Sequence, residues 1–188
     1  MDEVLYAQGL PFEDVREGAW YERAVSYVYY HDLMQGTGKN LFAPKAHLTR
    51  AEMVQILYNR DGDGQKAEKS PFEDVKAGTW YCDAVAWAAE QGYDSGYGNG
   101  RFGPEDRLTR EQLAIILYGY AGKPETSGSL ADFSDSGSVR SYARKAMQWA
   151  VEQHIIGGTA EGKLEPQGFA TRAEAAAMIR NYFTNPAI

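Results

Sequence analysis

Residues 48–53 read Leu48-Thr49-Arg50-Ala51-Glu52-Met53, and this stretch has the features of a helix start. Threonine is a favoured N-cap residue, and a glutamate three positions later can form the reciprocal hydrogen bonds of a capping box. The flanking apolar residues, Leu48 and Met53, complete a hydrophobic staple. The stretch therefore predicts a helix that begins immediately after Thr49.

The same signal occurs twice more along the chain. Residues 108–113 read LTREQL and residues 170–175 read ATRAEA, so glutamine replaces glutamate in one copy and alanine weakens the staple in the other. A shift of 60 residues aligns the whole first copy with the second, as when Phe12 recurs at Phe72. The third copy follows at an offset that settles at 62, with one extra residue before Tyr142. A regular repeat of this length predicts an array of similar structural units.

Each unit is predicted to hold two helices joined by a loop rich in glycine and proline. The first helix of the first copy is expected at about residues 20–30, where apolar residues fall on one stripe. It should end where the backbone turns left-handed, at Asp32, Gly92 and His154 in the three copies, since these residue types tolerate a positive φ best. The prediction is an all-α fold of three helix-loop-helix repeats, with boundaries at 1–64, 65–126 and 127–188.

Two loop motifs resemble ligand sites only in part. The Gly-rich loops lack the third glycine of a dinucleotide loop and follow no parallel strand. Residues 61–64 resemble the start of a calcium loop, but Lys66 and Phe72 replace its required glycine and closing glutamate. We expect a solvated linker there, and we expect no metal, no cofactor and no catalytic residue in the chain.

The arginine that follows each N-cap threonine is not explained by helix formation. The helix dipole disfavours a cation at this position by roughly 0.3–1 kcal/mol. One explanation is a salt bridge between repeats, for example to the aspartate of a Phe-x-Asp motif. The other is an anion site that combines the guanidinium with free amides of the helix N-terminus. The residues alone leave both open.

Composition limits the function further. The chain has 188 residues, a net charge of −7 and a pI of about 5.0, without a cluster of basic residues, so a nucleic-acid partner is not expected. No apolar run reaches the roughly 18 residues of a membrane span. The single cysteine excludes an intrachain disulfide framework. Residues 1–5 lack the pattern of a signal peptide, which leaves the compartment open because a mature fragment looks the same.

The combined pattern closely resembles the S-layer homology (SLH) domain. It consists of Phe-x-Asp-Val, Trp-Tyr-x-x-Ala-Val, a Gly-rich turn, Phe-x-Pro and Leu-Thr-Arg-Ala-Glu, repeated about every 60 residues over roughly residues 11–183. The resemblance implies a pseudo-threefold spindle in which the second helices form a central three-helix bundle. It also implies a monomeric, extracellular module that anchors a surface protein to the cell wall. The expected partner is a secondary wall polysaccharide carrying an anionic pyruvate ketal, bound in grooves between repeats.

That implied function suits the chemistry of the repeated residues. A guanidinium can hold a carboxylate through two hydrogen bonds, an aspartate can accept from sugar hydroxyls, and an aromatic ring can stack on a sugar. Glycines let backbone amides approach the ligand. Core packing of the tryptophans, and helix capping or arginine pairing by the aspartates, stay open as structural alternatives. The predicted ligand-binding residues are Asp14, Trp20, Gly36, Arg50, Asp74, Trp80, Gly96, Arg110, Asp135, Tyr142, Gly158 and Arg172.

Two other functions remain open. One is a protein-interaction scaffold in which the arginines are structural and no glycan site exists. The other is an enzyme, which the pattern disfavours. The three histidines occupy different repeat positions, and the paired carboxylates of a glycosidase are normally unique and not tripled.

Overall fold

The structure is a computed structural model that describes residues 9–188. The prediction about a signal peptide concerns residues 1–5 and lies outside the described residues. Residues 9–188 form six α-helices and two short 3₁₀ helices, with isolated bridges in place of any longer strand. The all-α prediction is confirmed.

Capping boxes begin the second helix of every repeat. These helices are α3 (Arg50–Asp61), α5 (Arg110–Tyr120) and α7 (Arg172–Phe183). At α3, the Glu52 amide donates to the Thr49 hydroxyl at 3.3 Å, and the Thr49 amide donates to the Glu52 carboxylate at 2.8 Å. The same reciprocal bonds form in α5 and α7, as the sequence predicts.

The first helices are shorter and lack a side-chain cap. They are α2 (Glu22–Tyr30), α4 (Cys82–Glu90) and α6 (Arg144–Glu152). The predicted left-handed residues follow them, with φ of 56° at Asp32, 73° at Gly92 and 55° at His154. The 3₁₀ helices η1 (Ser136–Ser138) and η2 (Ser141–Ala143) occupy the segment that holds the extra residue of the third copy.

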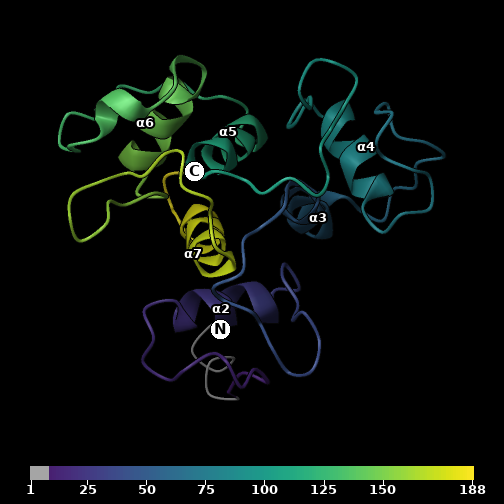
Figure 1. The fold of residues 1–188 in the computed structure, drawn as a ribbon, viewed down its shortest axis with the longest axis horizontal. Coiled ribbons are helices and arrows are strands. Elements are labelled where there is room, and N and C mark those ends of the chain that lie inside the picture. Colours follow the sequence, from purple (N-terminus) through teal and green to yellow (C-terminus); the bar gives the residue numbers. More distant parts are fainter. Residues whose placement is uncertain (1–8) are drawn as a thin grey trace.

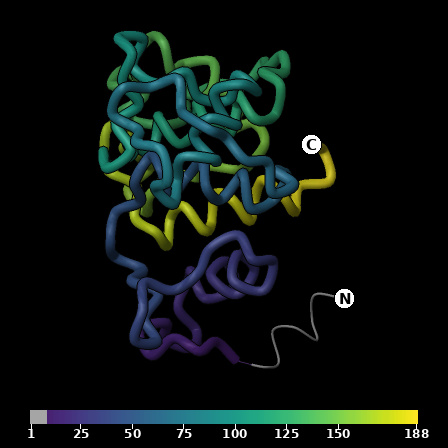
Figure 2. Tube along the Cα trace, turned by 90° about the vertical axis from the view of Figure 1, so that its right-hand side faces the viewer, coloured from purple at the N-terminus to yellow at the C-terminus, as the bar shows by residue number. Residues whose placement is uncertain are grey.

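The helices pack between repeats. The closest helix pairs are α2 with α7, α3 with α4, and α5 with α6. Each first helix therefore packs on the second helix of the preceding repeat, and α2 closes the circle by packing on α7. Figure 1 shows α3, α5 and α7 toward the middle, with α2, α4 and α6 around them. In the side view of Figure 2, the part of the first repeat that holds α2 (purple) lies directly below α7 (yellow).

A cyclic set of backbone hydrogen bonds joins the starts of the three second helices. The Leu48 amide donates to the Ala170 carbonyl at 3.0 Å, the Ala170 amide to the Leu108 carbonyl at 2.8 Å, and the Leu108 amide to the Leu48 carbonyl at 3.0 Å. All three side chains are fully buried. The connections between repeats thus follow a threefold pattern, and the spindle shape expected from the resemblance remains a prediction.

The loops are fixed by aromatic packing against the Phe-x-Asp segments. The rings of Phe12 and Phe42 lie 5.5 Å apart, and the Phe12 ring also lies against Gly36. A Cβ atom on Gly36 would come within 2.7 Å of both Phe12 and the Leu41 carbonyl, closer than atoms can approach without displacement. This glycine is therefore required by the packing of its own loop.

Candidate functional site

The arginines at the helix starts are buried. Arg50, Arg110 and Arg172 are only 5%, 8% and 6% exposed. Each Nε donates to a loop carbonyl of the next repeat, with acceptors Phe102, Leu164 and Phe42 at 2.8, 2.8 and 2.9 Å, respectively. The arginines therefore join neighbouring repeats.

Two of the arginines also form ion pairs with capping-box glutamates. Arg110 Nη1 lies 2.7 Å from Glu174 Oε1, and Arg172 Nη1 lies 2.7 Å from Glu52 Oε1. Burial lowers the pKa of Arg172, while the neighbouring Glu52 acts to raise it. The predicted salt bridge between repeats is present. The suggested partner, an aspartate of the Phe-x-Asp motif, is wrong, because the glutamates that cap the helices take that place.

The amides at the helix starts are not free. The Arg50 amide donates to the Asp106 carbonyl and the Ala51 amide to the Pro104 carbonyl, both at 3.0 Å. The amide of Glu52 is held by the capping threonine. The first amides of α5 and α7 are bound in the same way. The alternative of an anion site that uses free amides of the helix N-terminus is therefore wrong.

A cavity of ≈ 580 Å³, here called cavity A, brings together residues from all three repeats. Trp20 comes from the first repeat, Arg110 from the second, and the Gly-rich loop and α7 from the third. The lining residues that matter below are Trp20, Arg110, Ile156, Gly158, Thr159, Glu174 and Asn181. A volume of this size lies within the range of small-molecule sites.

A second cavity of ≈ 620 Å³, here called cavity B, repeats this arrangement one step around the molecule. Its lining includes the equivalent residues Trp80, Arg172, Met34, Gly36, Thr37, Glu52 and Asn59. The tryptophan now comes from the second repeat, the arginine from the third, and the loop and α3 from the first. Six of the predicted site residues thus meet in two composite cavities.

The tryptophans are surface residues. Trp20 is 67% exposed and Trp80 is 60% exposed, and the equivalent Tyr142 of the third copy is 60% exposed. Each tryptophan ring packs edge-on against the following tyrosine, with centroids 5.3 Å apart for Trp20 and Tyr21. The alternative that the tryptophans form the core is therefore wrong, and they leave ring surface available to a ligand.

The lining of cavities A and B combines opposite charges, amides and an apolar surface. The hydrogen bonds of Arg110 and Arg172 within the protein each use three of the five guanidinium N–H groups: Nε–H, one on Nη1 and one on Nη2. The paired glutamate balances the arginine charge, so each cavity has a polar edge without a large net charge. A ligand with many hydroxyl groups and an apolar face suits such a lining.

The third arginine, Arg50, has different surroundings. The place around Arg50 that is equivalent to cavities A and B is here called the third position. Arg50 Nη2 binds both carboxylate oxygens of Asp94, at 2.6 and 2.8 Å. Burial raises the pKa of Asp94, while Arg50 and the Gly96 amide act to lower it. The Gly96 amide donates to Asp94 at 2.9 Å, so this predicted glycine holds an internal carboxylate.

The three aspartates of the Phe-x-Asp motif bind loop amides. Asp14 accepts from the amides of Phe42 and Ala43, both at 2.8 Å. Asp74 and Asp135 accept equivalent pairs. Burial acts to raise the pKa of Asp74 and of Asp135, but these amides, together with a nearby Arg101 or Lys163, lower it. The aspartates fix the loops, and neither of the suggested structural roles, helix capping or pairing with the N1 arginines, matches these bonds.

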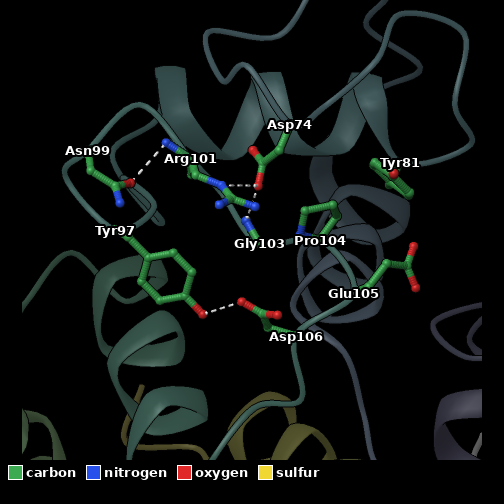
Figure 3. Close-up of a pocket in the computed structure, with 9 residues that line it drawn as sticks. All are labelled: Asp74, Tyr81, Tyr97, Asn99, Arg101, Gly103, Pro104, Glu105 and Asp106. Atoms are coloured by element: carbon green, nitrogen blue, oxygen red, sulfur yellow. Dashed lines mark hydrogen bonds and ion pairs between the residues drawn. The ribbon is translucent and has the colours of Figure 1, made fainter.

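Asp14 and Asp74 line a different pair of cavities from the arginines and tryptophans. The cavity at Asp74 measures ≈ 530 Å³ and includes Tyr81, Tyr97 and Arg101. Figure 3 shows the Arg101 guanidinium directed at Asp74, and the ion pair measures 3.6 Å. The structure therefore separates the predicted aspartates from cavities A and B, and their role in ligand binding stays a prediction.

Several residues of this site were not predicted from the sequence. The capping-box pattern explains Glu52 and Glu174 by helix capping alone, and no motif singles out Asp94 or the two asparagines, Asn59 and Asn181. Each glutamate forms the capping box of its own helix and an ion pair with the arginine of another repeat. No local sequence motif predicts the ion pair. The signal for Asp94 is its position, where the other copies carry methionine and isoleucine.

Comparison with known proteins identifies the family. The model of the S-layer homology domain matches residues 11–54, 71–114 and 132–176. The chain belongs to the S-layer homology domain family. These domains are cell-wall-binding modules, and membership indicates a location at the cell surface or cell wall.

Relatives include S-layer proteins and enzymes. The chain is 32% identical to the Surface-layer 125 kDa protein of Lysinibacillus sphaericus over 172 residues, which cover 87% of this chain and 14% of that protein. It is 32% identical to an S-layer protein of Bacillus thuringiensis subsp. finitimus, over 92% of this chain and 21% of the relative. An endoglucanase of Bacillus sp. (strain KSM-635) is 28% identical over 92% of this chain and 19% of the enzyme. The chain thus spans about a fifth or less of these curated relatives.

Two further observations bear on the predicted partners. Within residues 9–188, every helix is too short or too polar to cross a membrane. The same residues contain no cluster of three or more histidine, cysteine, aspartate or glutamate side chains placed to hold a metal ion.

Proposed function

We propose that this SLH chain is a non-catalytic module that binds a secondary cell-wall polysaccharide in cavities A and B and so anchors a larger surface protein. The observation that carries the proposal is the repetition of one composite lining. An exposed tryptophan, a buried arginine paired with a half-buried glutamate, an asparagine and a Gly-rich loop recur in both cavities, each assembled from three repeats. The names of the S-layer relatives support the same role.

The finer part of the proposal concerns the anionic sugar. A pyruvate ketal presents a carboxylate, and the N–H groups of Arg110 and Arg172 left by their internal bonds are suitable donors. The net charge of −7 opposes long-range attraction of an anionic polymer. Recognition must therefore depend on contacts inside the cavities, with the sugar ring stacked on Trp20 or Trp80.

Tryptophan substitutions test the proposal directly. We expect Trp20→Ala and Trp80→Ala each to weaken retention of the chain on purified cell walls, and the double variant to abolish it. Phe169→Ala is the matched control, because Phe169 is also an exposed aromatic residue (48%) but lines neither cavity. Retention of the double variant at the level of the unaltered chain would contradict the proposal.

A chemical treatment of the wall separates the two parts of the proposal. Mild acid hydrolysis removes pyruvate ketals and leaves glycosidic bonds largely intact. Loss of retention after this treatment supports recognition of the carboxylate. Unchanged retention, combined with sensitivity to the tryptophan substitutions, would show that the module binds the polysaccharide without using its pyruvate.

A further inference from the structure

Cavities A and B have five lining residues of matching type in common. The surroundings of Arg50, the third position, have other residue types at these five places in the repeat. The cavities share a tryptophan, an asparagine, a glutamate, a threonine and an apolar residue at these places. The equivalent residues of the third position are Tyr142, Gly119, Gln112, Tyr97 and Asp94, respectively. The capping box and the buried arginine, Arg50, are retained at the third position.

Asp94 places a carboxylate where the cavities have an apolar wall. Its equivalents, Met34 and Ile156, line cavities B and A. Both Asp94 oxygens bind Arg50, and the side chains of this pair are only 6% and 7% exposed. A carboxylate that receives two charge-assisted hydrogen bonds from one arginine is the same chemistry that a pyruvate ketal would supply.

Tyr97 covers the same guanidinium. The centre of its ring lies 4.7 Å from the Arg50 guanidinium carbon, within the range of a cation–π contact. Its hydroxyl donates to Asp106 at 2.8 Å, and Figure 3 shows the ring held in this direction. The equivalents of Tyr97 in cavities A and B are threonines, which are too small to cover an arginine.

The aromatic residue of the third position is also engaged internally. The Tyr142 hydroxyl lies 3.0 Å from Arg140 Nη1 and 3.5 Å from the buried carboxylate of Glu111. Glu111 in turn lies 3.6 Å from Arg140. Alanine takes the place of Glu111 in the other two repeats, so this set of contacts is unique to the third position.

We propose that Asp94 is an internal ligand of Arg50 that occupies the third position in place of glycan, so that the module has two binding sites and not three. This inference rests on the proposed function of cavities A and B. Because Gln112 is neutral, Asp94 also supplies the charge that Glu52 and Glu174 supply to the other arginines. The internal carboxylate therefore replaces the structural partner and the ligand together.

Calorimetric stoichiometry tests the inference. The probe is the terminal repeat unit of the wall polysaccharide, released from purified walls of the bacterium that encodes the chain, so that each molecule occupies one site. We expect two bound molecules per unaltered chain. Met34→Asp introduces a carboxylate beside Arg172 in cavity B, at the place equivalent to Asp94. We expect this variant to bind one molecule of the probe per chain.

The reverse exchange opens the third position. The variant Asp94→Met/Tyr97→Thr/Gln112→Glu gives Arg50 the acidic partner of cavity B and removes the two side chains, of Asp94 and Tyr97, that bind or cover its guanidinium. We expect three bound molecules per chain. The glutamate is included so that Arg50 keeps an acidic partner, because a buried arginine without one destabilises the fold. Thermal unfolding of each variant verifies that the fold is intact.

The outcomes separate this inference from the proposed function. Three sites in the unaltered chain, or two sites in both the unaltered chain and the folded triple variant, would overturn the role of Asp94 and leave glycan binding established. A folded Met34→Asp variant that still binds two molecules would do the same. If the unaltered chain binds no probe at all, both the proposed function and the inference fail.

Discussion

Arg50, Arg110 and Arg172 show how a locally unfavourable residue becomes useful in the assembled protein. Each stands at a helix start, where the dipole disfavours a cation by roughly 0.3–1 kcal/mol. The assembled chain compensates with a loop carbonyl and a carboxylate from the next repeat. The arginine therefore has its full effect only when neighbouring repeats are in place.

Replacing one of these arginines should cost stability as well as any binding. We expect Arg110→Met to lower the free energy of unfolding by about 3 kcal/mol, because loss of one member of a buried ion pair leaves the other without a partner. The value lies at the lower end for such pairs, since the side chain of Glu174 is 26% exposed. Urea unfolding followed by circular dichroism measures the change.

The control for this substitution is Arg107→Met, which removes an exposed arginine from the same connection. A surface change of this kind should stay within about 0.5 kcal/mol. If Arg110→Met were equally mild, the contacts of the guanidinium between repeats would not be important for folding, and Arg110 would have to be assigned to ligand binding alone.

At the scale of single elements, the Phe-x-Asp segments and the Gly-rich loops depend on each other. The aspartate of the segment accepts two amide hydrogen bonds from the loop, and the phenylalanine packs against the loop glycine. These contacts join residues between 24 and 30 positions apart. They fix the loops that form one wall of cavities A and B.

Asp74 and Asp135, whose pKa values are lowered, should give the fold a measurable acid sensitivity. The amides of Phe102 and Gly103 outweigh burial and lower the pKa of Asp74 below its ordinary value of 3.8. A lowered carboxyl pKa stabilises the fold above the pKa of the unfolded chain, and this contribution is lost as the pH falls through the folded value. We expect the melting temperature to drop below about pH 4, and Asp74→Asn to reduce both the stability near neutral pH and the size of this drop.

Melting curves between pH 2 and 7 measure the effect, with the exposed Asp132→Asn as the matched control. If the melting temperature of Asp74→Asn fell by the same amount at low pH as that of the unaltered chain, the loop amides would not bind this carboxylate strongly.

Local signals predict the elements well and their partners poorly. The capping boxes, the left-handed residues and the all-α class follow from residues within a few positions of each other, and all are confirmed. The packing of α2 on α7 brings together helices near the two ends of the chain. The hydrophobic periodicity of the sequence does not predict this contact. The same holds for the site, where aromatic and basic positions were predicted but the glutamate partner and Asp94 were not.

At the scale of the whole molecule, cavities A and B belong to no single repeat. Each takes its tryptophan, its arginine and its loop from three different repeats. The ring of backbone bonds through Leu48, Leu108 and Ala170 places the helix starts that carry the arginines. Binding and folding should therefore both require all three repeats and the contacts that join each repeat to the next.

Removal of one repeat tests this dependence. In a chain of residues 1–126, α2 loses α7, α5 loses α6, and only the pair of α3 and α4 remains. Cavity A also loses Glu174 and its loop, and cavity B loses Arg172. We expect this fragment to show no cooperative unfolding transition in calorimetry and no retention on cell walls.

A circular permutant provides the control, because it cuts the chain at another connector and removes no repeat. It begins at residue 65, joins residue 188 to residue 9 through a glycine–serine linker, and ends at residue 64. All three helix pairs and both cavities can form in it, although α3 and α4 now stand at opposite ends of the chain. We expect a single cooperative transition and retention close to that of the unaltered chain. A cooperative, wall-binding fragment of residues 1–126 would instead show that two repeats suffice and that closure of the circle by α2 and α7 is dispensable.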